Sequence, residues 1–260
     1  MHVREFRMLA SRLKDKSTVQ LNIMLSVHGR RNRWSGHHGL ECGVFYNRFG
    51  AYCVPDSCRH RPAAQRIMAG QVWEQETLAF IREAYSGGDI VHAGTFFGDF
   101  LPALSRTAAG GKVWAFEPNP ESYRCASITA LLNGLDNVVL TCAALGEAMA
   151  VESFVTRDAE GRALGGASHV AMAGETSDAE TRIVAIDAVV PADRRVGIIQ
   201  LDVEGYAQQA LAGALRTIAR DRPAIILETP PHEWVSAHLA PLGYRAEGTV
   251  NHNTILRAAP

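Results

Sequence analysis

Two stretches decide the fold: Asp89–Phe100, DIVHAGTFFGDF, and Lys112–Pro118, KVWAFEP. The first is a short apolar strand that leads Gly94 and Gly98 into a turn, where a backbone without side chains can approach a ligand closely. The second is another strand that ends at an acid, Glu117, because a proline follows it. A strand, a glycine turn, a helix and a second strand ending in an acid form the order in which a parallel sheet holds an adenosine-containing cofactor.

The spacing of the glycines and the acid indicates which cofactor this turn would hold. Glu117 follows Gly94 by 23 residues, close to the interval of about 20 residues at which an acid binds ribose hydroxyls in doubly wound folds. The glycines are spaced G-x-x-x-G, whereas the tight turn that cradles a pyrophosphate needs G-x-G-x-x-G. The looser turn favours S-adenosylmethionine, which carries adenosine without phosphates, over NAD.

Three motifs follow one another along the chain: residues 91–100, VHAGTFFGDF, residues 115–120, AFEPNP, and residues 199–205, IQLDVEG. Together they resemble the FkbM-type family of S-adenosylmethionine-dependent methyltransferases, which act mainly as O-methyltransferases. The resemblance runs from Asp89 to Glu228, about half of the chain. It implies an α/β fold of the Rossmann-like class I methyltransferase type, with a mostly parallel seven-stranded sheet and helices on both faces.

The predicted cofactor site combines the glycine turn with the ends of the following strands. Its residues are His92, Gly94, Thr95, Phe97, Gly98, Asp99, Glu117, Pro118, Asn119, Ala144 and Asp202. Glu117 is expected to bind the ribose. The family usually has an acid where this chain has His92, so Asp99 or a backbone group would bind the amino acid end of the cofactor. A core histidine bonded to the backbone explains His92 equally well.

Four polar side chains at or just beyond two strand ends form the predicted acceptor site: Asp202, Glu204, Glu228 and His232. Open α/β sheets bind ligands at this carboxyl edge. Methyl transfer is an in-line displacement, in which holding the nucleophile against the methyl carbon supplies much of the acceleration. An alcohol also needs a base or a metal to take its proton. We expect these four residues to be catalytic, and Glu204, His232 and His169 to contact the substrate.

Each of these residues also has a non-catalytic interpretation. Asp202 or Glu204 could cap the following helix, and Glu228 could be a solvated acid. His232 could be an exposed loop histidine. The three acids could instead hold Mg2+, which takes a few carboxylates together with waters and substrate oxygens.

Length, composition and charge fit one globular enzyme domain with an extension. The chain has 260 residues, of which 47% are hydrophobic, and a formal charge of −1. This charge argues against a nucleic acid partner, because binding phosphates needs a cationic surface. No run approaches the roughly 18 apolar residues of a membrane span, and the amino terminus lacks the apolar core of a signal peptide, so we expect a cytoplasmic protein. The five cysteines, an odd number, are expected to be reduced thiols.

Residues 1–70 differ from the rest and are predicted to be an extension in front of a methyltransferase domain at residues 71–260. Residues 30–39, RRNRWSGHHG, predict an exposed basic loop, and residues 44–54 predict a hairpin with its turn at residues 47–50. Such an extension would cover the cofactor, contact substrate or make contacts in a homo-oligomer.

A zinc site can also be drawn in this extension, but its spacing is unfavourable. Cys53, Cys58 and His60 lie near one another, and His37, His38 or Cys42 would complete the ligands. The spacing Cys-x4-Cys has no second matching pair, so packing thiols are the better interpretation.

Alternating strand and helix patterns continue after residue 70, which supports a parallel sheet with crossover helices. The predicted elements are helix 71–85, helix 119–133 with Asn119 as cap and Gly134 as stop, strand 138–146, a long loop at 157–181, strands 182–186 and 196–201, helix 206–220, strand 224–227, and an antiparallel pair within 244–256. Loops as long as 157–181 are usually functional or mobile in compact domains.

The sequence therefore favours an O-methyltransferase acting on a hydroxyl of a sugar, glycan or glycosylated natural product, a substrate class that the family resemblance implies. Two alternatives stay open. A nicotinamide-dependent oxidoreductase is disfavoured by the missing third glycine of the dinucleotide fingerprint. A catalytically inactive cofactor-binding protein, suggested by His92 in place of the family's acid, is disfavoured because an inactive site has no need of clustered acids.

Overall fold

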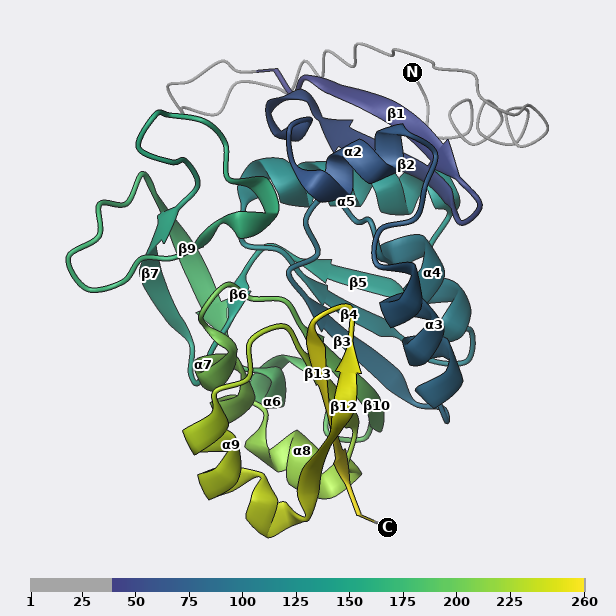
Figure 1. Ribbon diagram of the computed structural model, residues 1–260, viewed down its shortest axis with the longest axis vertical. Helices are drawn as coiled ribbons and strands as arrows, with labels where there is room; N and C mark the ends of the chain where they lie inside the picture. Colours follow the sequence, from purple (N-terminus) through teal and green to yellow (C-terminus); the bar gives the residue numbers. More distant parts are fainter. Residues whose placement is uncertain (1–38, 260) are drawn as a thin grey trace.

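A seven-stranded sheet forms the centre of the computed structural model, which describes residues 39–259 (Figure 1). Its strand order is β12-β13-β11-β10-β3-β4-β5. The strands are β3 Asp89–Ala93, β4 Val113–Phe116, β5 Val138–Thr141, β10 Val196–Leu201, β11 Ala224–Leu227, β12 Tyr244–Val250 and β13 Asn253–Ala258. The five strands from β11 to β5 are parallel, and β13 is antiparallel to both β11 and β12. The mostly parallel seven-stranded sheet and the antiparallel pair at the carboxyl terminus are confirmed.

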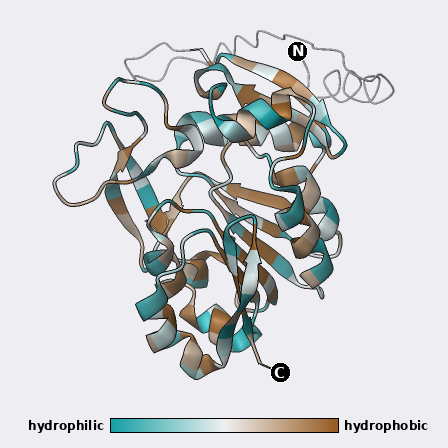
Figure 2. Cartoon of the chain, viewed as in Figure 1, coloured by the Kyte–Doolittle hydropathy of each residue, from teal (hydrophilic) through white to brown (hydrophobic). Residues whose placement is uncertain are grey.

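Helices cover both faces of this sheet, as predicted. On one face lie α3 Gln75–Ala84 and α4 Leu101–Thr107, and beside α4 lies α5 Pro120–Asn133. On the other face lie α6 Ile186–Val189, α7 Ala207–Ala212, α8 Leu215–Asp221 and α9 His232–His238. Successive residues of β10 point to opposite faces of the sheet. Ile198 packs in the core with α3 and α4, and Ile199 packs in the core with α7 and α8. The central strands are therefore apolar on both faces, as the brown strands in Figure 2 show.

The carboxyl ends of the central strands lie level with one another. Leu201 of β10 pairs with Ala93 of β3 and with Leu227 of β11. Ala93 in turn pairs with Phe116 of β4. This register brings the residues that directly follow four strands to one edge of the sheet: Gly94, Glu117, Asp202 and Glu228.

Two helix predictions need correction at their ends. The helix predicted from residue 71 begins at Gln75, because Glu74 has the left-handed φ of 40° and ends the preceding turn. The helix predicted at 206–220 consists of α7 and α8 with a break at Gly213, where a side chain would meet the backbone oxygen of Gly146. The predicted boundaries of α5 are confirmed, since the Asn119 side chain accepts hydrogen bonds from the first turn and Gly134 ends the helix.

The predicted loop at 157–181 is wrong in part, because it contains strands of a second sheet. This four-stranded sheet has the order β6-β9-β7-β8. Its strands are β6 Ala144–Leu145, β7 Ala150–Val155, β8 His169–Val170 and β9 Ala179–Val184. The third strand and its exit, predicted at 138–146, correspond to β5 and to the short strand β6 that follows it. We call residues 144–184 the inserted sheet; it lies to the left in Figure 1.

Residues 39–70 pack directly on α5. They contain the hairpin β1 Cys42–Asn47 and β2 Gly50–Pro55, the 3-10 helix η1 Asp56–Cys58, and α2 Pro62–Met68. The predicted hairpin and its turn are confirmed. The backbone nitrogen of Cys53 donates to Thr129 Oγ1 at 2.9 Å, and that of Ala51 donates to Asn133 Oδ1 at 3.0 Å. The hairpin therefore shares its core with the larger domain.

The predictions of a basic loop and of a zinc site in the extension can be compared with the structure only from residue 39 onward. The predicted basic loop at 30–39 and the histidines His37 and His38 lie outside the described residues, apart from Gly39. Within residues 39–259, Cys53, Cys58 and His60 form no group of metal ligands. All five cysteines are free thiols, as predicted. None of the helices in residues 39–259 combines the length and apolar character needed to cross a membrane.

Candidate active site

The turn after β3 touches the turn after β10. Gly94 has a φ of 81°, and a Cβ at this position would lie 1.8 Å from the backbone oxygen of Asp202. The backbone nitrogen of Asp202 donates to Ala93 O at 3.0 Å. Only glycine fits here, both because of its left-handed conformation and because the neighbouring backbone leaves no room for a side chain.

Glu117 lies at the end of β4 and bridges two loops. Its Oε2 accepts the Phe96 N–H at 2.6 Å, and its Oε1 accepts the Asn119 N–H at 2.8 Å. The residue is only 3% exposed. Burial raises the pKa of Glu117 to about 8, although the two backbone donors favour the charged form. Each carboxylate oxygen keeps a free lone pair that could accept a ribose hydroxyl.

A narrow cavity of about 30 Å3 adjoins Glu117. We call it the Glu117 cavity. Six of its lining residues come from the predicted site: Gly94, Glu117, Pro118, Ala144, His169 and Asp202. Apolar and aromatic side chains of the inserted sheet and of the turn after β10, Phe154, Val170 and Tyr206, complete the wall. An apolar lining with a few convergent polar groups is typical of small-molecule sites, but this cavity is much smaller than such sites usually are.

A second cavity of about 180 Å3 adjoins the first. We call it the acidic cavity, because five carboxyl side chains line it: Glu74, Asp99, Asp202, Glu204 and Glu228. Among residues 39–259, Arg61 is the only lysine or arginine that lines it. The two cavities share Gly94, Gly166 and Asp202, so they meet at the contact between the two turns.

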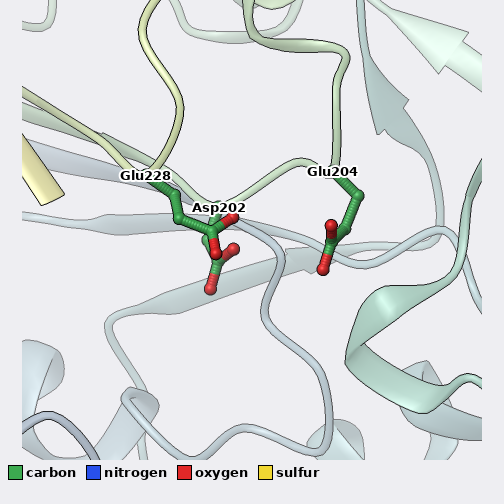
Figure 3. Close-up of side chains that lie close together, drawn as sticks. All are labelled: Asp202, Glu204 and Glu228. Carbon is green, nitrogen blue, oxygen red and sulfur yellow. The ribbon is translucent and has the colours of Figure 1, made fainter. Parts of the chain in front are cut away.

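Three of these acids converge on one point. Asp202 and Glu204 follow β10, and Glu228 follows β11. One carboxylate oxygen from each lies within 4.8 Å of the others, and Figure 3 shows the three carboxylates turned toward the same space. Burial first, and then the charge of Glu228, raise the pKa of Asp202 well above its usual range. The same two causes raise the pKa of Glu204.

Two more buried side chains line the acidic cavity: His92, which is part of β3, and Asp99, which lies in the turn after it. Burial, with the charge of Glu74, raises the pKa of Asp99 to about 7. His92 stacks on Phe100, and its Nδ1 bonds to Gln200 Oε1. Because the amide oxygen can only accept, His92 Nδ1 carries the hydrogen. Burial lowers the pKa of His92 to about 4, which keeps the ring neutral.

This arrangement leaves the second ring nitrogen of His92 as an acceptor. Within residues 39–259, His92 Nε2 is buried and has no hydrogen-bond partner, and His92 lines the acidic cavity. It is thus a neutral side chain with a free lone pair at the position where the family usually has an acid. That property suits an ammonium or hydroxyl donor.

Several predicted site residues line neither cavity. Phe97 packs in the core beneath the hairpin, and Gly98 has a φ of 87°, where a side chain would meet Leu101 of α4 and Thr129 of α5. Thr95 is fully buried. Asn119 caps α5 and donates to Ser168 Oγ at 3.0 Å. His232 is exposed at the first residue of α9.

His169, predicted to contact substrate, lies in the Glu117 cavity and not in the acidic cavity. Its Nε2 is 2.9 Å from Glu175 Oε1. The structure therefore places His169 on the side where the cofactor is expected.

Sequence reasoning missed several residues of the two cavities. Trp73 and Glu74 precede α3 and line the acidic cavity, together with Arg61 and Phe96. The missed signal is clearest for Gln200, a polar residue inside the apolar strand β10 that holds His92. Strand interiors rarely bury an amide without a partner.

A comparison with family models identifies the chain. The model described as Methyltransferase FkbM domain matches residues 92–245, which is more than half of the chain. The chain belongs to the FkbM methyltransferase family. This confirms the resemblance noted in the sequence and the expectation of an S-adenosylmethionine-dependent methyltransferase. No curated protein matches the chain.

Solved structures of methyltransferases are similar to this FkbM protein in outline. An FkbM methyltransferase from Methylobacillus flagellatus matches 65% of this chain and 43% of its own, with 18% identity and a TM-score of 0.44. A tRNA (uracil-54, C5)-methyltransferase of Pyrococcus abyssi, in complex with S-adenosyl-L-homocysteine, matches 86% and 48%, with 14% identity and a TM-score of 0.42. A methyltransferase of Aquifex aeolicus matches 75% and 91%, with 16% identity and a TM-score of 0.39. The chain thus spans less than half the length of the first two.

Proposed function

We propose that this FkbM protein transfers the methyl group of S-adenosylmethionine to a hydroxyl of a sugar, glycan or glycosylated natural product. The observation that carries the proposal is the convergence of Asp202, Glu204 and Glu228 where the Glu117 cavity meets the acidic cavity. The adenosine would lie among the residues that line the Glu117 cavity, with its ribose on Glu117; these residues would have to move apart, because a space of about 30 Å3 holds little more than a water molecule. Its amino acid end would pass Gly94 toward Asp99 and His92, and the acceptor would enter from the acidic cavity.

Asp202 is the proposed general base. The acceptor oxygen attacks the methyl carbon, the carbon–sulfur bond breaks, and its electron pair goes to sulfur, which leaves S-adenosylhomocysteine. The hydroxyl proton goes to the Asp202 carboxylate, whose raised pKa makes it a better proton acceptor near neutral pH than an ordinary aspartate. Glu204 and Glu228 would accept hydrogen bonds from other hydroxyls of the acceptor and hold it in line with the methyl group.

The charge of the acidic cavity favours a neutral, hydroxyl-rich acceptor. Five carboxyl side chains and one arginine line it. Phosphate or carboxylate groups would be repelled there, whereas carboxylates are strong acceptors for hydroxyl donors. This supports a sugar over a nucleic acid or a phosphorylated acceptor.

Mg2+ would be held by the same three acids if the reaction uses a metal. Three carboxylates within 4.8 Å of one another provide the oxygen donors that Mg2+ takes, with waters or substrate hydroxyls filling the other positions. A bound cation would acidify a coordinated hydroxyl, and Asp202 would then serve as a ligand rather than as the base. Loss of turnover in a chelator and its return with Mg2+ would establish this variant; turnover that a chelator leaves unchanged supports the base mechanism.

Two measurements test the proposal. The first is the shift in melting temperature with S-adenosylmethionine, S-adenosylhomocysteine and NAD, for the natural chain and for Glu117→Ala. We expect stabilisation by the two adenosyl compounds and its loss in the variant, with exposed Glu160→Ala as the control. The second is incorporation of labelled methyl into a panel of glycosides, followed by mass spectrometry. Stabilisation by NAD alone, or tight cofactor binding without transfer to any hydroxyl, would contradict the proposal.

A further inference from the structure

A third space, of about 550 Å3, lies next to the acidic cavity and shares two lining residues with it. We call it the outer groove. Its wall comes from the hairpin turn, from α2, from residues 70–76 and from the turn between β12 and β13. Trp73 and Glu74 line both the outer groove and the acidic cavity, so the two spaces lie on either side of these two residues. The volume falls within the range of roughly 300 to 1,000 Å3 that small-molecule sites occupy.

The side chains of the outer groove carry hydrogen-bonding groups with balanced charge. Three side-chain amides line it, those of Gln71, Gln75 and Asn251. Of the lining residues in the described part of the chain, two arginines, Arg48 and Arg66, are matched by two acids, Glu74 and Glu76. The groove therefore has no net preference for an anion or a cation, and its amides include both donors and acceptors for a hydroxyl-bearing ligand.

Part of this polar surface is fixed in place by bonds within the protein. Glu76 Oε2 accepts from Asn251 Nδ2 at 3.0 Å, and Glu74 Oε2 accepts from Thr77 Oγ1 at 2.8 Å and from Asn253 Nδ2 at 2.9 Å. Arg66 Nη1 donates to Gln71 Oε1 at 2.8 Å. By contrast, the exposed Gln75 side chain has no hydrogen-bond partner within residues 39–259. The groove thus combines preorganised polar groups with free ones.

Trp73 is the aromatic surface of this region. It is half-buried, and its packing against the hydrophobic cores below the hairpin and beside α3 fixes its position. A sugar ring has one face of C–H groups and a rim of hydroxyls, so it can lie on an indole face while its hydroxyls bond to nearby amides. Trp73 lies between the space for the reacting group and the groove with the amides, where the junction between two sugar units would pass.

We propose that the outer groove binds the sugar units next to the one that is methylated, so that the acceptor is a neutral oligosaccharide or an oligosaccharide-bearing glycoside. This inference rests on the proposed function for the identity of the reacting unit. The terminal unit lies in the acidic cavity, the second packs on Trp73, and the third bonds to Gln71 and Gln75. A charged glycan fits less well because the arginines are matched by acids, and an apolar tail fits less well because amides and charges line the groove.

Binding tests this inference without any need for turnover. The protein loaded with S-adenosylhomocysteine is applied to an array of neutral mono-, di-, tri- and tetrasaccharide glycosides, and affinities for the bound glycans are measured by titration. We expect di- and trisaccharides to bind at least about tenfold more tightly than the matching monosaccharide. Trp73→Ala should remove most of this gain, as loss of an aromatic anchor does at other sites.

Matched variants separate binding from folding. Trp73→Phe retains an aromatic face and should retain part of the gain, while the exposed pair Gln71→Ala and Gln75→Ala should weaken trisaccharides more than disaccharides. Trp234→Ala, which removes an indole that lines none of the three spaces, should leave the length dependence unchanged. The affinity for S-adenosylhomocysteine should stay the same in the groove variants.

Saccharide binding tests the outer groove, and methyl transfer tests the proposed function, so the two can fail independently. No saccharide binding, equal affinity for all lengths, or a length dependence that Trp73→Ala and Trp73→Phe leave intact would overturn the inference, even if methyl transfer to a simple glycoside is observed. Length-dependent binding that Trp73→Ala removes and Trp73→Phe only weakens supports it, even if the methylated position is not the proposed hydroxyl. Methyl transfer itself is measured separately with the same glycans.

Discussion

The carboxylate of Glu117 accepts the backbone N–H of Phe96 at 2.6 Å, and so joins the end of β4 to the turn after β3. Phe96 has a left-handed φ of 49°, a conformation that costs energy for a residue with a side chain. The bond from Glu117 helps to hold it. The residue expected to bind the ribose therefore also shapes the loop along which the cofactor would lie.

Glu117→Gln and Glu117→Ala should differ in their effects because of this double role. Glutamine keeps one oxygen that can accept a backbone N–H, so the fold should remain, while affinity for S-adenosylhomocysteine should fall by about tenfold or more because an amide nitrogen, which only donates, replaces one acceptor oxygen. Alanine leaves two buried N–H groups without acceptors and should also lower the melting temperature of the free protein. Titration calorimetry and thermal unfolding check the two parts. Equal cofactor affinity in the natural chain and the glutamine variant would exclude a ribose contact.

Gly94→Ala should abolish cofactor binding and strongly destabilise the protein. The added Cβ would lie 1.8 Å from Asp202 O, far inside contact distance, and it would meet backbone rather than a movable side chain. The turns after β3 and β10 would have to separate. Gly110→Ala is the matched control, because a Cβ there meets nothing within 4 Å. A Gly94→Ala protein with normal thermal stability and normal binding would show that the two turns do not touch in solution.

Glu228→Gln should shift the pH dependence of methyl transfer to lower pH. A base must be ionised to accept a proton, so the rate rises with pH through the pKa of the base. The charge of Glu228 helps to raise the pKa of Asp202, and its removal lowers that pKa. The rising limb of the kcat profile should therefore move toward acid. Asp202→Asn should lower kcat by about 10^2 to 10^4 at every pH.

Glu233→Gln is the matched control for Glu228→Gln. Glu233→Gln changes an exposed acid in the first turn of α9, close to Glu228 in sequence, and should leave the profile in place. A Glu228→Gln profile that coincides with the natural one would show that Asp202 is not the titrating base.

Asp99→Asn should become increasingly stabilising, relative to the natural chain, as the pH rises. The pKa of Asp99 is about 7 in the folded protein and 3.8 when free. Because the folded-state pKa is raised, the folded form binds its proton more tightly than the unfolded form. The stability this contributes is present below pH 4 and is lost as the pH rises through 7. The asparagine side chain has no such loss.

Thermal unfolding of the free protein at constant ionic strength measures this difference. The melting temperature of Asp99→Asn minus that of the natural chain should increase by several degrees between pH 5 and pH 8, since 1 kcal/mol corresponds to about 2–4 °C for a domain of this size. Asp193→Asn, at an exposed carboxyl, should show no trend. A difference that shrinks with pH would mean that Asp99 is stabilised in its charged form.

The sequence predicted those parts of the site that follow strand ends. Gly94, Glu117, Asp202 and Glu228 each follow an apolar run, and the register of parallel strands brings such positions to one edge. Strand periodicity is local information, and a level sheet edge follows from it. For this reason the mostly parallel sheet and the group of acids at its carboxyl edge could be inferred from the amino-acid sequence alone.

Other parts of the site depend on contacts that the sequence does not encode locally. Within the motif at 94–99, sequence could not separate Phe97, which packs under the hairpin, from Phe96, which lines the acidic cavity. Trp73 falls within the helix predicted at 71–85, although the left-handed turn at Glu74 leaves it outside α3. The short strand β8 has only two residues and gains its conformation by pairing with β7.

The positions of the Glu117 cavity and the outer groove bear on the order in which substrates bind. The wall of the first comes in part from the inserted sheet, at the left of Figure 1, and the wall of the second from the hairpin turn, α2 and the β12–β13 turn, which lie to the right of that sheet. Donor and acceptor would thus enter by separate routes and meet only beside Asp202. Neither needs to wait for the other, so steady-state kinetics should follow a random-order sequential mechanism.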